Sequence, residues 1–221
     1  MALASFSRVK KRVIQLLGAN NSDYVDYVDG QMGAFPYDQE LIDAALEADA
    51  QLVTEAYFPH PTLSTSFYTT VSGLANGAAL PGFLGRTGKV ELKNAGGVWE
   101  LGTEAQSIDD INNLIRYGAS YLGAGNYEGM YKLDGSGYIY HTSNEARVAY
   151  PVYTKTSALQ SLDMHESALI AGTLMMLYKF GSPFHSEAGA QFYMQFFENQ
   201  KQKIALNHDL DEVPAMQGGN G

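Results

Sequence analysis

His165 and Glu166 stand side by side in DMHESALIAGTLMMLYKF, residues 163–180, a stretch with the composition of a helix. A histidine followed by a glutamate is the first half of the zinc-protease motif H-E-x-x-H. In that motif two histidines one helical turn apart bind the metal, and the glutamate acts as a base. The residue four positions after His165 is Leu169, so the second ligand is missing. We therefore expect His165 to lie in the first turn of a helix, near a surface or an interface.

Patterns for other kinds of catalysis are also missing from the sequence. The remaining histidines share no ligand spacing: His60, His141, His185 and His208. The chain has no cysteine, which excludes a thiolate nucleophile, a thiolate metal site and a disulfide. No stretch matches a nucleophile elbow or a phosphate-binding loop, and the G-x-G of LGAGNYEG does not join a strand to a helix. We expect a protein that is not an enzyme and that binds neither a metal nor a cofactor, although a pair of carboxylates could still serve a hydrolase.

Charge is distributed unevenly along the chain, whose net charge is −10. Residues 1–20 hold four bases and no acid: Arg8, Lys10, Lys11 and Arg12. Residues 21–60 hold nine acids and no Lys or Arg, among them Asp38, Glu40, Asp43 and Glu47. These groups are two solvated faces, complementary surfaces that dock one copy onto another, or a surface that repels DNA. An acidic chain is not expected to grip DNA phosphates.

Helical and β-rich segments alternate in blocks. Apolar periodicity predicts helices over residues 3–17, 36–56, 163–180 and 182–206. Asp163 and Glu166 have the spacing of a capping box, and Phe192, Phe196 and Ile204 are expected on the buried face of the last helix. Between these pairs we predict strands at 66–73 and 147–154, hairpins at 89–101 and 130–141, and a short helix at 107–118 capped by Ser107. Pro151 indicates an edge or bulged strand.

The predicted fold is of the α+β class: a four-helix bundle with a β-rich insertion between its second and third helices, followed by an extended C-terminal tail. The corresponding domains are residues 1–61 with 157–206, residues 62–156, and an arm at residues 207–221. No apolar run approaches the roughly 20 residues of a membrane span, and the N-terminal segment lacks the pattern of a signal peptide. We expect the protein to be made in the cytoplasm and not to be anchored in a membrane.

Three stretches resemble the head-to-tail adaptor proteins of tailed bacteriophages. They are ELIDAALEADAQLVTEAYFPHP, SGLANGAALPGFLGRTGKVELKNAGGVWEL and the terminal helical pair HESALIAGTLMMLYKFGSPFHSEAGAQFYMQFFENQKQKIA. The resemblance extends over roughly residues 35–206. It implies a structural virion protein, a connector in the neck of the particle, that forms a ring of twelve copies beneath the portal. Such a ring extends the DNA channel, through which DNA passes without specific binding during ejection, and offers a surface to a tail or nozzle protein.

The resemblance also implies partners and a location. The protein would be found in the virion neck, and in the host cytoplasm during assembly. A C-terminal extension would contact the portal or a neighbouring copy, here through Asn207, His208, Leu210, Val213, Pro214 and Met216. Alternative interpretations are a stopper or tail terminator, a DNA-packaging subunit, a glycan-binding tail module that uses the Tyr-rich β region, and a hydrolase.

Overall fold

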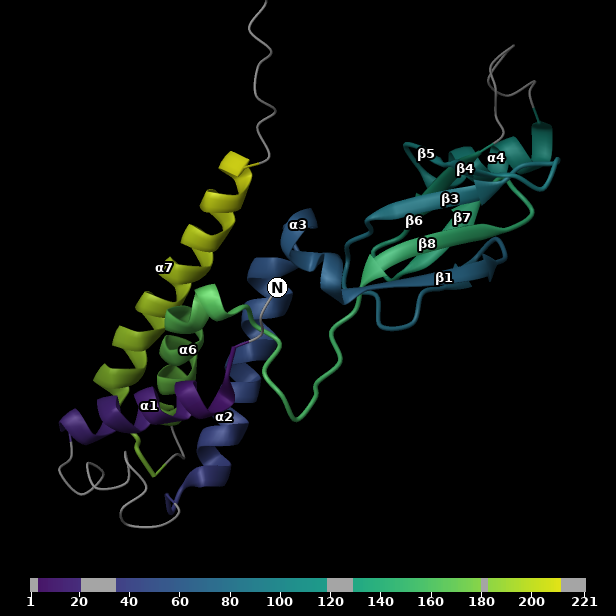
Figure 1. Ribbon diagram of the computed structural model, residues 1–221. Helices are drawn as coiled ribbons and strands as arrows, with labels where there is room; N and C mark the ends of the chain where they lie inside the picture. Colours follow the sequence, from purple (N-terminus) through teal and green to yellow (C-terminus); the bar gives the residue numbers. More distant parts are fainter. Residues whose placement is uncertain (1–3, 21–34, 119–128, 180–182, 212–221) are drawn as a thin grey trace, which may run out of the picture. The chain divides into compact units, whose positions relative to one another are not determined.

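The computed structural model of the chain describes residues 4–20, 35–118, 129–179 and 183–211. The chain forms two compact units (Figure 1). One unit combines Met1–Leu63 with Thr154–Gly221 and is helical, and the other is Ser64–Tyr153 and contains the strands. Each unit has a hydrophobic core of its own.

The helical unit is built from two separate stretches of the chain. Its four long helices are α1 (Phe6–Asn20), α2 (Asp38–Gln51), α6 (Glu166–Tyr178) and α7 (Glu187–Asp211). A π-helical segment, η2 (Leu52–Tyr57), continues α2, and a 3-10 turn, η4 (Asp163–His165), leads into α6. Short turns α3 (Pro61–Ser64) and η3 (Thr65–Phe67) stand where the chain passes into the other unit. Within the described ranges no helix is both long and apolar enough to cross a membrane.

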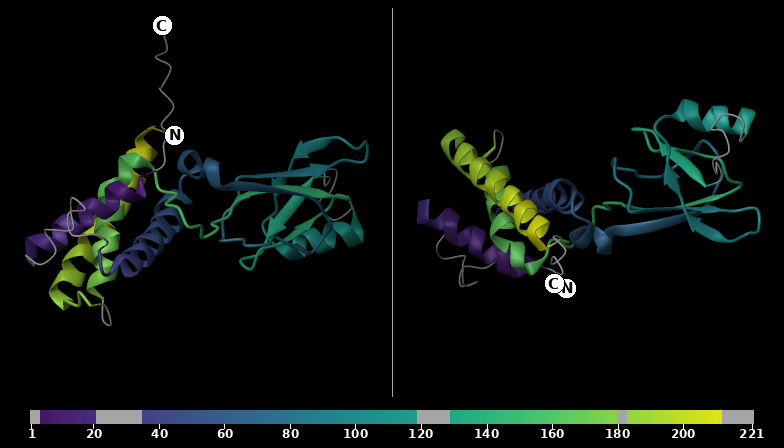
Figure 2. Two further views of the ribbon diagram at one scale, coloured as in Figure 1. Left: turned by 60° about the horizontal axis from the view of Figure 1, so that its bottom comes forward. Right: turned by 90° about the horizontal axis from the view of Figure 1, so that it is seen from above.

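Helix α6 is the centre of this unit. It packs against α1, α2 and α7, and most of its residues are buried because its apolar side chains are distributed all around the helix. Gly172 permits the closest approach: a Cβ atom there would lie 2.8 Å from the Cβ of Ala48 on α2 and 3.0 Å from the ring of Phe197 on α7. The other helices are therefore arranged around α6 (Figure 2).

Helix α7 is held by a narrow stripe of its surface. Phe197, Lys201 and Ile204 recur at helical spacing and are buried. The Lys201 ammonium forms ion pairs with Glu55 of η2 and, at 2.7 Å, with Glu198. The opposing charges compensate for the burial of this lysine on an otherwise apolar stripe. Most other side chains of α7 are exposed or only partly buried.

The β unit contains two four-stranded sheets, with strand orders β1-β8-β3-β4 and β2-β7-β6-β5. The strands of the first sheet are β1 (Tyr68–Leu74), β3 (Lys89–Lys93), β4 (Trp99–Leu101) and β8 (Ala146–Pro151). Those of the second are β2 (Ala78–Ala79), β5 (Thr103–Glu104), β6 (Met130–Leu133) and β7 (Tyr138–His141). Both sheets contribute to one core, which consists of Leu74, Leu80, Val90, Leu92, Ile139, Ala146, Val148 and Tyr150.

Features of the β unit that depend on residues close together in the sequence agree with the prediction. The two hairpins are confirmed, as β3–β4 and β6–β7. Ser107 is also confirmed as the cap of α4 (Ile108–Tyr117): its hydroxyl accepts a hydrogen bond from the Asp110 amide at 3.1 Å, and the Asp110 carboxylate accepts one from the Ser107 amide at 3.0 Å. The helix ends at Gly118, whose φ of 60° suits a glycine.

The prediction of an edge or bulged strand at Pro151 is wrong. Strand β8 lies inside its sheet, between β1 and β3. Pro151 is the last residue of the strand and is opposite Tyr68, so its missing N–H interrupts the ladder only at the end. The irregularity is on β1 instead, where the register shifts between Val71 and Leu74 and Gly73 has a φ of 72°.

The prediction of a four-helix bundle with one β-rich insertion is also wrong. The described residues contain five helices of ten residues or more, together with two four-stranded sheets. The fifth, α4, contacts β6 and β7, so the β region is a second α+β unit with its own core. In the helical unit the helices do not contribute equally to one core, because α6 is enclosed by the others. Periodicity predicted that each helix has an apolar face, but it did not predict what covers that face.

Candidate functional site

A buried polar cluster occupies the place where the sequence suggested half of a metal motif. Asp49 of α2 and Ser161 are both fully buried. The Asp49 carboxylate accepts hydrogen bonds from the backbone amides of Gln160, at 3.0 Å, and Ser161, at 2.8 Å, and from the Ser161 hydroxyl. This carboxylate therefore fixes the segment by which the chain returns to the helical unit.

Tyr57 joins His165 to the same cluster. The Tyr57 hydroxyl accepts a hydrogen bond from the Leu162 amide at 3.0 Å and lies 2.7 Å from Nδ1 of His165. Burial raises the pKa of the Tyr57 phenol, so this group keeps its proton at neutral pH. A protonated phenol can donate to Nδ1 when the imidazole carries its proton on Nε2.

The cluster has the residue types of a catalytic relay but not the access that catalysis needs. Asp49 and Ser161 are enclosed, and their polar atoms bind each other and the backbone. Leu169, which replaces the second histidine of the zinc motif, is fully buried in the core. Among the described residues no three His, Cys, Asp or Glu side chains are placed to hold a metal ion. The arrangement can anchor η4 and α6 to α2.

The predicted capping box at the start of α6 is wrong. The residue at the N-cap position of α6 is His165, and no side chain caps this helix. Asp163 and Glu166 instead bind the guanidinium of Arg8 on α1, at 3.1 Å for Asp163. A guanidinium with several donors can hold two carboxylates, whereas the predicted cap would have used only backbone amides. Because 155 residues separate Arg8 from Asp163, this pairing could not be inferred from the sequence.

The structure places the predicted basic residues on α1, and part of their charge is already balanced. Arg8 binds Asp163 and Glu166, and Lys10 forms an ion pair with Asp38. Arg12 donates a hydrogen bond to Gln15 at 3.2 Å. Lys11 and Arg12 are exposed.

The predicted acidic residues lie on α2, and three of the four face outward. Glu40, Asp43 and Glu47 are exposed, whereas Asp38 is the partner of Lys10 in the same chain. Asp43 accepts a hydrogen bond from Gln39 at 3.0 Å, and Glu47 lies 3.9 Å from Lys155. The structure thus brings one predicted base and one predicted acid together within a single chain and leaves the other acids at the surface.

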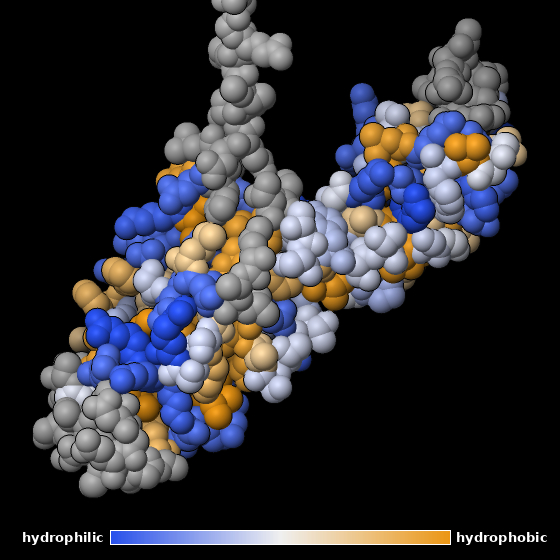
Figure 3. All heavy atoms as spheres, viewed as in Figure 1, coloured by the Kyte–Doolittle hydropathy of each residue, from blue (hydrophilic) through white to orange (hydrophobic). Residues whose placement is uncertain are grey.

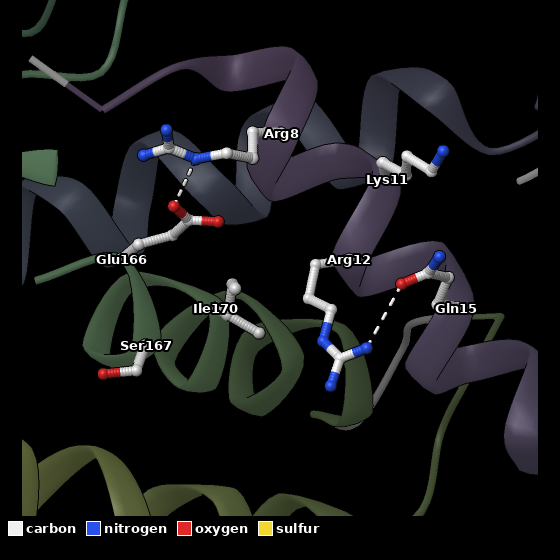
Figure 4. A pocket seen from close by; sticks show the side chains of 7 residues that line it. All are labelled: Arg8, Lys11, Arg12, Gln15, Glu166, Ser167 and Ile170. Carbon is white, nitrogen blue, oxygen red and sulfur yellow. Dashed lines mark hydrogen bonds and ion pairs between the residues drawn. The ribbon is translucent and has the colours of Figure 1, made fainter.

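A groove crosses α1 and α6 beside these bases (Figure 4). Its basic part has a volume of about 380 Å³ and is lined by Arg8, Lys11, Arg12, Gln15, Glu166, Ser167 and Ile170. Its aromatic part has a volume of about 290 Å³ and is lined by Arg12, Leu16, Ser167, Ile170, Ala171, Phe192, Tyr193 and Phe196. Because the two parts share Arg12, Ser167 and Ile170, they form one continuous groove, which we call the α1–α6–α7 groove.

Exposed apolar side chains of α7 line the aromatic part of the groove, and Leu206 is a further exposed apolar residue near the end of this helix. Phe192 is 62% exposed, Phe196 41% and Leu206 62%. Figure 3 shows such apolar surface among the hydrophilic residues of the helical unit. The prediction that Phe192 and Phe196 belong to the buried face of this helix is wrong, although Ile204 is buried as predicted. The residue that occupies the core instead is Phe197.

The predicted C-terminal arm falls partly within α7. Helix α7 continues to Asp211, so Asn207, His208 and Leu210 belong to a helix and not to an extended tail. Helix formation needs no tertiary partner at these positions, because the helix is already nucleated by the packed turns before them. Val213, Pro214 and Met216 lie outside the described residues.

No protein-family model matches the sequence, and no curated protein matches it significantly.

Proposed function

We propose that the chain is a structural virion protein: a ring-forming adaptor that joins the portal of a tailed bacteriophage to its tail and extends the DNA channel. The observation that carries the proposal is the exposed apolar surface of α7. The stripe of Phe197, Lys201 and Ile204 is buried within the unit, whereas Phe192 and Phe196 are exposed and line the aromatic part of the groove. Contiguous apolar surface of this kind is typical of a protein that associates with another.

The arrangement of charge supports association between copies. Bases on α1 and acids on α2 lie on different helices of one unit, so a second copy can present the complementary helix. Contacts between two different faces of identical subunits generate a ring when the rotation between copies closes. The proposed partners are therefore other copies of the chain, in a ring of twelve, together with the portal and a tail or nozzle protein. DNA would pass through the ring without specific binding.

The mass of the purified chain, measured by light scattering with and without a portal ring, tests this function. We expect a closed oligomer, alone or on the portal, and density for it in the neck of imaged particles. The double variant Phe192→Ser/Phe196→Ser should stay folded and lose the oligomer, because both side chains are outside the core. Leu84→Ser is the matched control, since Leu84 is an exposed apolar residue of the β unit.

Other results would favour the alternatives. A salt-dependent mobility shift on DNA would indicate a packaging subunit, because phosphate contacts weaken as salt rises. Binding of glycans would favour a tail module, and turnover in a hydrolase screen would favour an enzyme. A chain that stays monomeric with and without the portal, and that is missing from the neck of particles, would refute the adaptor.

A further inference from the structure

The α1–α6–α7 groove has two chemically different ends. The basic end contains Lys11 and Arg12, and the aromatic end contains Phe192 and Phe196. Arg12 stands at the junction, where it is exposed and donates to Gln15. An occupant of the groove therefore needs acidic side chains in a row, with apolar surface beside them.

The exposed face of α2 has the required acids at the required spacing. Glu40, Asp43 and Glu47 recur at i, i+3 and i+7, which puts them in one row along the helix. The wall of the groove on α1 has the same spacing in Arg8, Lys11 and Gln15. At 1.5 Å per residue each row is about 10 Å long. Ala50, seven residues after Asp43 and only partly buried, adds apolar surface to the same row.

The groove and the row of acids cannot meet within one copy. Ile170 of α6 lines the groove, whereas Gly172 faces Ala48 of α2. Two residues correspond to about 200° around an α-helix, so the groove and α2 are on opposite sides of α6. Asp43 lies about 140° around α2 from Ala48, so it points away from α6.

We propose that the α1–α6–α7 groove receives the acidic face of α2 from a second copy of the chain. This inference rests on the proposed function and names the two surfaces that would join neighbouring copies. The groove of each copy accepts the next copy, and its own α2 enters the groove of the copy before it. Such a contact is heterologous and continues from copy to copy. The weak pair of Glu47 with Lys155, at 3.9 Å between exposed side chains, can exchange for partners in the groove.

Charge reversal on each surface of the full-length chain tests the inference. Arg12→Glu and Asp43→Lys change exposed residues, so both variants should keep the circular dichroism spectrum and melting temperature of the wild type. Each should weaken self-association roughly tenfold in sedimentation velocity, because a like charge replaces an opposite one. The effect should be larger at about 0.05 M than at about 0.5 M salt, since salt screens exposed charges. Arg116→Glu, an exposed reversal on α4 of the β unit, is the control and should associate like the wild type.

The combination of the two reversals decides the result. The double variant Arg12→Glu/Asp43→Lys restores opposite charges across the contact, and so does an equimolar mixture of the two single variants. Both should recover most of the lost association. Single variants that associate as strongly as the wild type, or a double variant no better than the singles, would overturn the inference and show that the groove has another occupant. If the inference fails in this way but the wild type still forms a ring, the proposed function is kept. If the wild type associates neither alone nor with the portal, both the inference and the proposed function are rejected.

Discussion

The buried carboxylate of Asp49 allows a direct test of how the helical unit is held together. Asp49→Ala removes the acceptor of three hydrogen bonds, two from backbone amides and one from the Ser161 hydroxyl. Hydrogen bonds to a charged group contribute about 1.5–3 kcal/mol each, but the native carboxylate also has a desolvation cost that its removal relieves. We therefore expect a loss of about 3–5 kcal/mol in the free energy of unfolding, the range for breaking one side of a buried charged network.

Two further variants calibrate this value. Asp49→Asn keeps one acceptor oxygen of similar geometry, so we expect about half of the loss, roughly 1–3 kcal/mol. Asp43→Ala is the matched control on the same helix: Asp43 is exposed, and the change should stay within about 0.5 kcal/mol.

The two units can be followed separately during urea unfolding. The only tryptophan of the chain, Trp99, lies on β4, so its fluorescence reports on the β unit. Far-ultraviolet circular dichroism is dominated by the long helices of the other unit. Asp49→Ala should shift the dichroism transition to lower urea and shift the fluorescence transition less. A variant within about 1 kcal/mol of the wild type would refute the reasoning, since it would mean that the buried donors find other partners.

Two more predictions concern the core and the response to acid. Gly172→Leu should reduce the free energy of unfolding by about 3 kcal/mol or more in the same urea titration, because even a Cβ atom there meets Ala48 and Phe197 at 3.0 Å or less; an unchanged midpoint would show that α2 and α7 can move apart. His141 is buried in the β unit, and this burial lowers its pKa below 6.5 in the folded state. The unfolded chain therefore binds more protons in acid, and the β unit should lose stability as pH falls below about 6.5. Melting followed by Trp99 fluorescence should show this slope, His141→Asn should flatten it, and equal slopes in both proteins would exclude His141 as its source.

Local signals in the sequence were sufficient for part of the fold. The capping box of Ser107 and Asp110 involves residues three apart, and each hairpin joins strands that are close in sequence. These features depend on interactions that the segment itself contains. They were predicted correctly for that reason.

Features that depend on distant partners were not predictable in this way. Pro151 favours an edge because proline lacks an N–H, but its strand pairs with both β1 and β3, which come from earlier parts of the chain. Asp163 was assigned to a helix cap because its guanidinium partner, Arg8, is near the other end of the sequence. In both cases the local rule was sound, and a contact from far along the chain determined the outcome.

The groove was missed for a related reason. The stretch FYMQFF, residues 192–197, places large side chains on every side of α7, so apolar periodicity does not define one buried face. Phe197 is in the core, one helical turn before Lys201, whose ammonium forms an ion pair with Glu55 of η2. The Phe197 ring packs against Gly172 of α6, and this contact distinguishes it from the exposed Phe196.

The division of the helical unit into two stretches of sequence has a consequence for the newly made chain. The β unit, Ser64–Tyr153, is one continuous stretch and can fold as soon as it leaves the ribosome. Helix α2 ends at Gln51, but the helix that covers it, α6, begins only at Glu166. At about 5–20 residues per second, synthesis leaves the apolar face of α2 without its partner for roughly 6–23 s. The apolar face of α2 therefore stays uncovered after the β unit has folded, and during this interval the nascent protein most needs a chaperone.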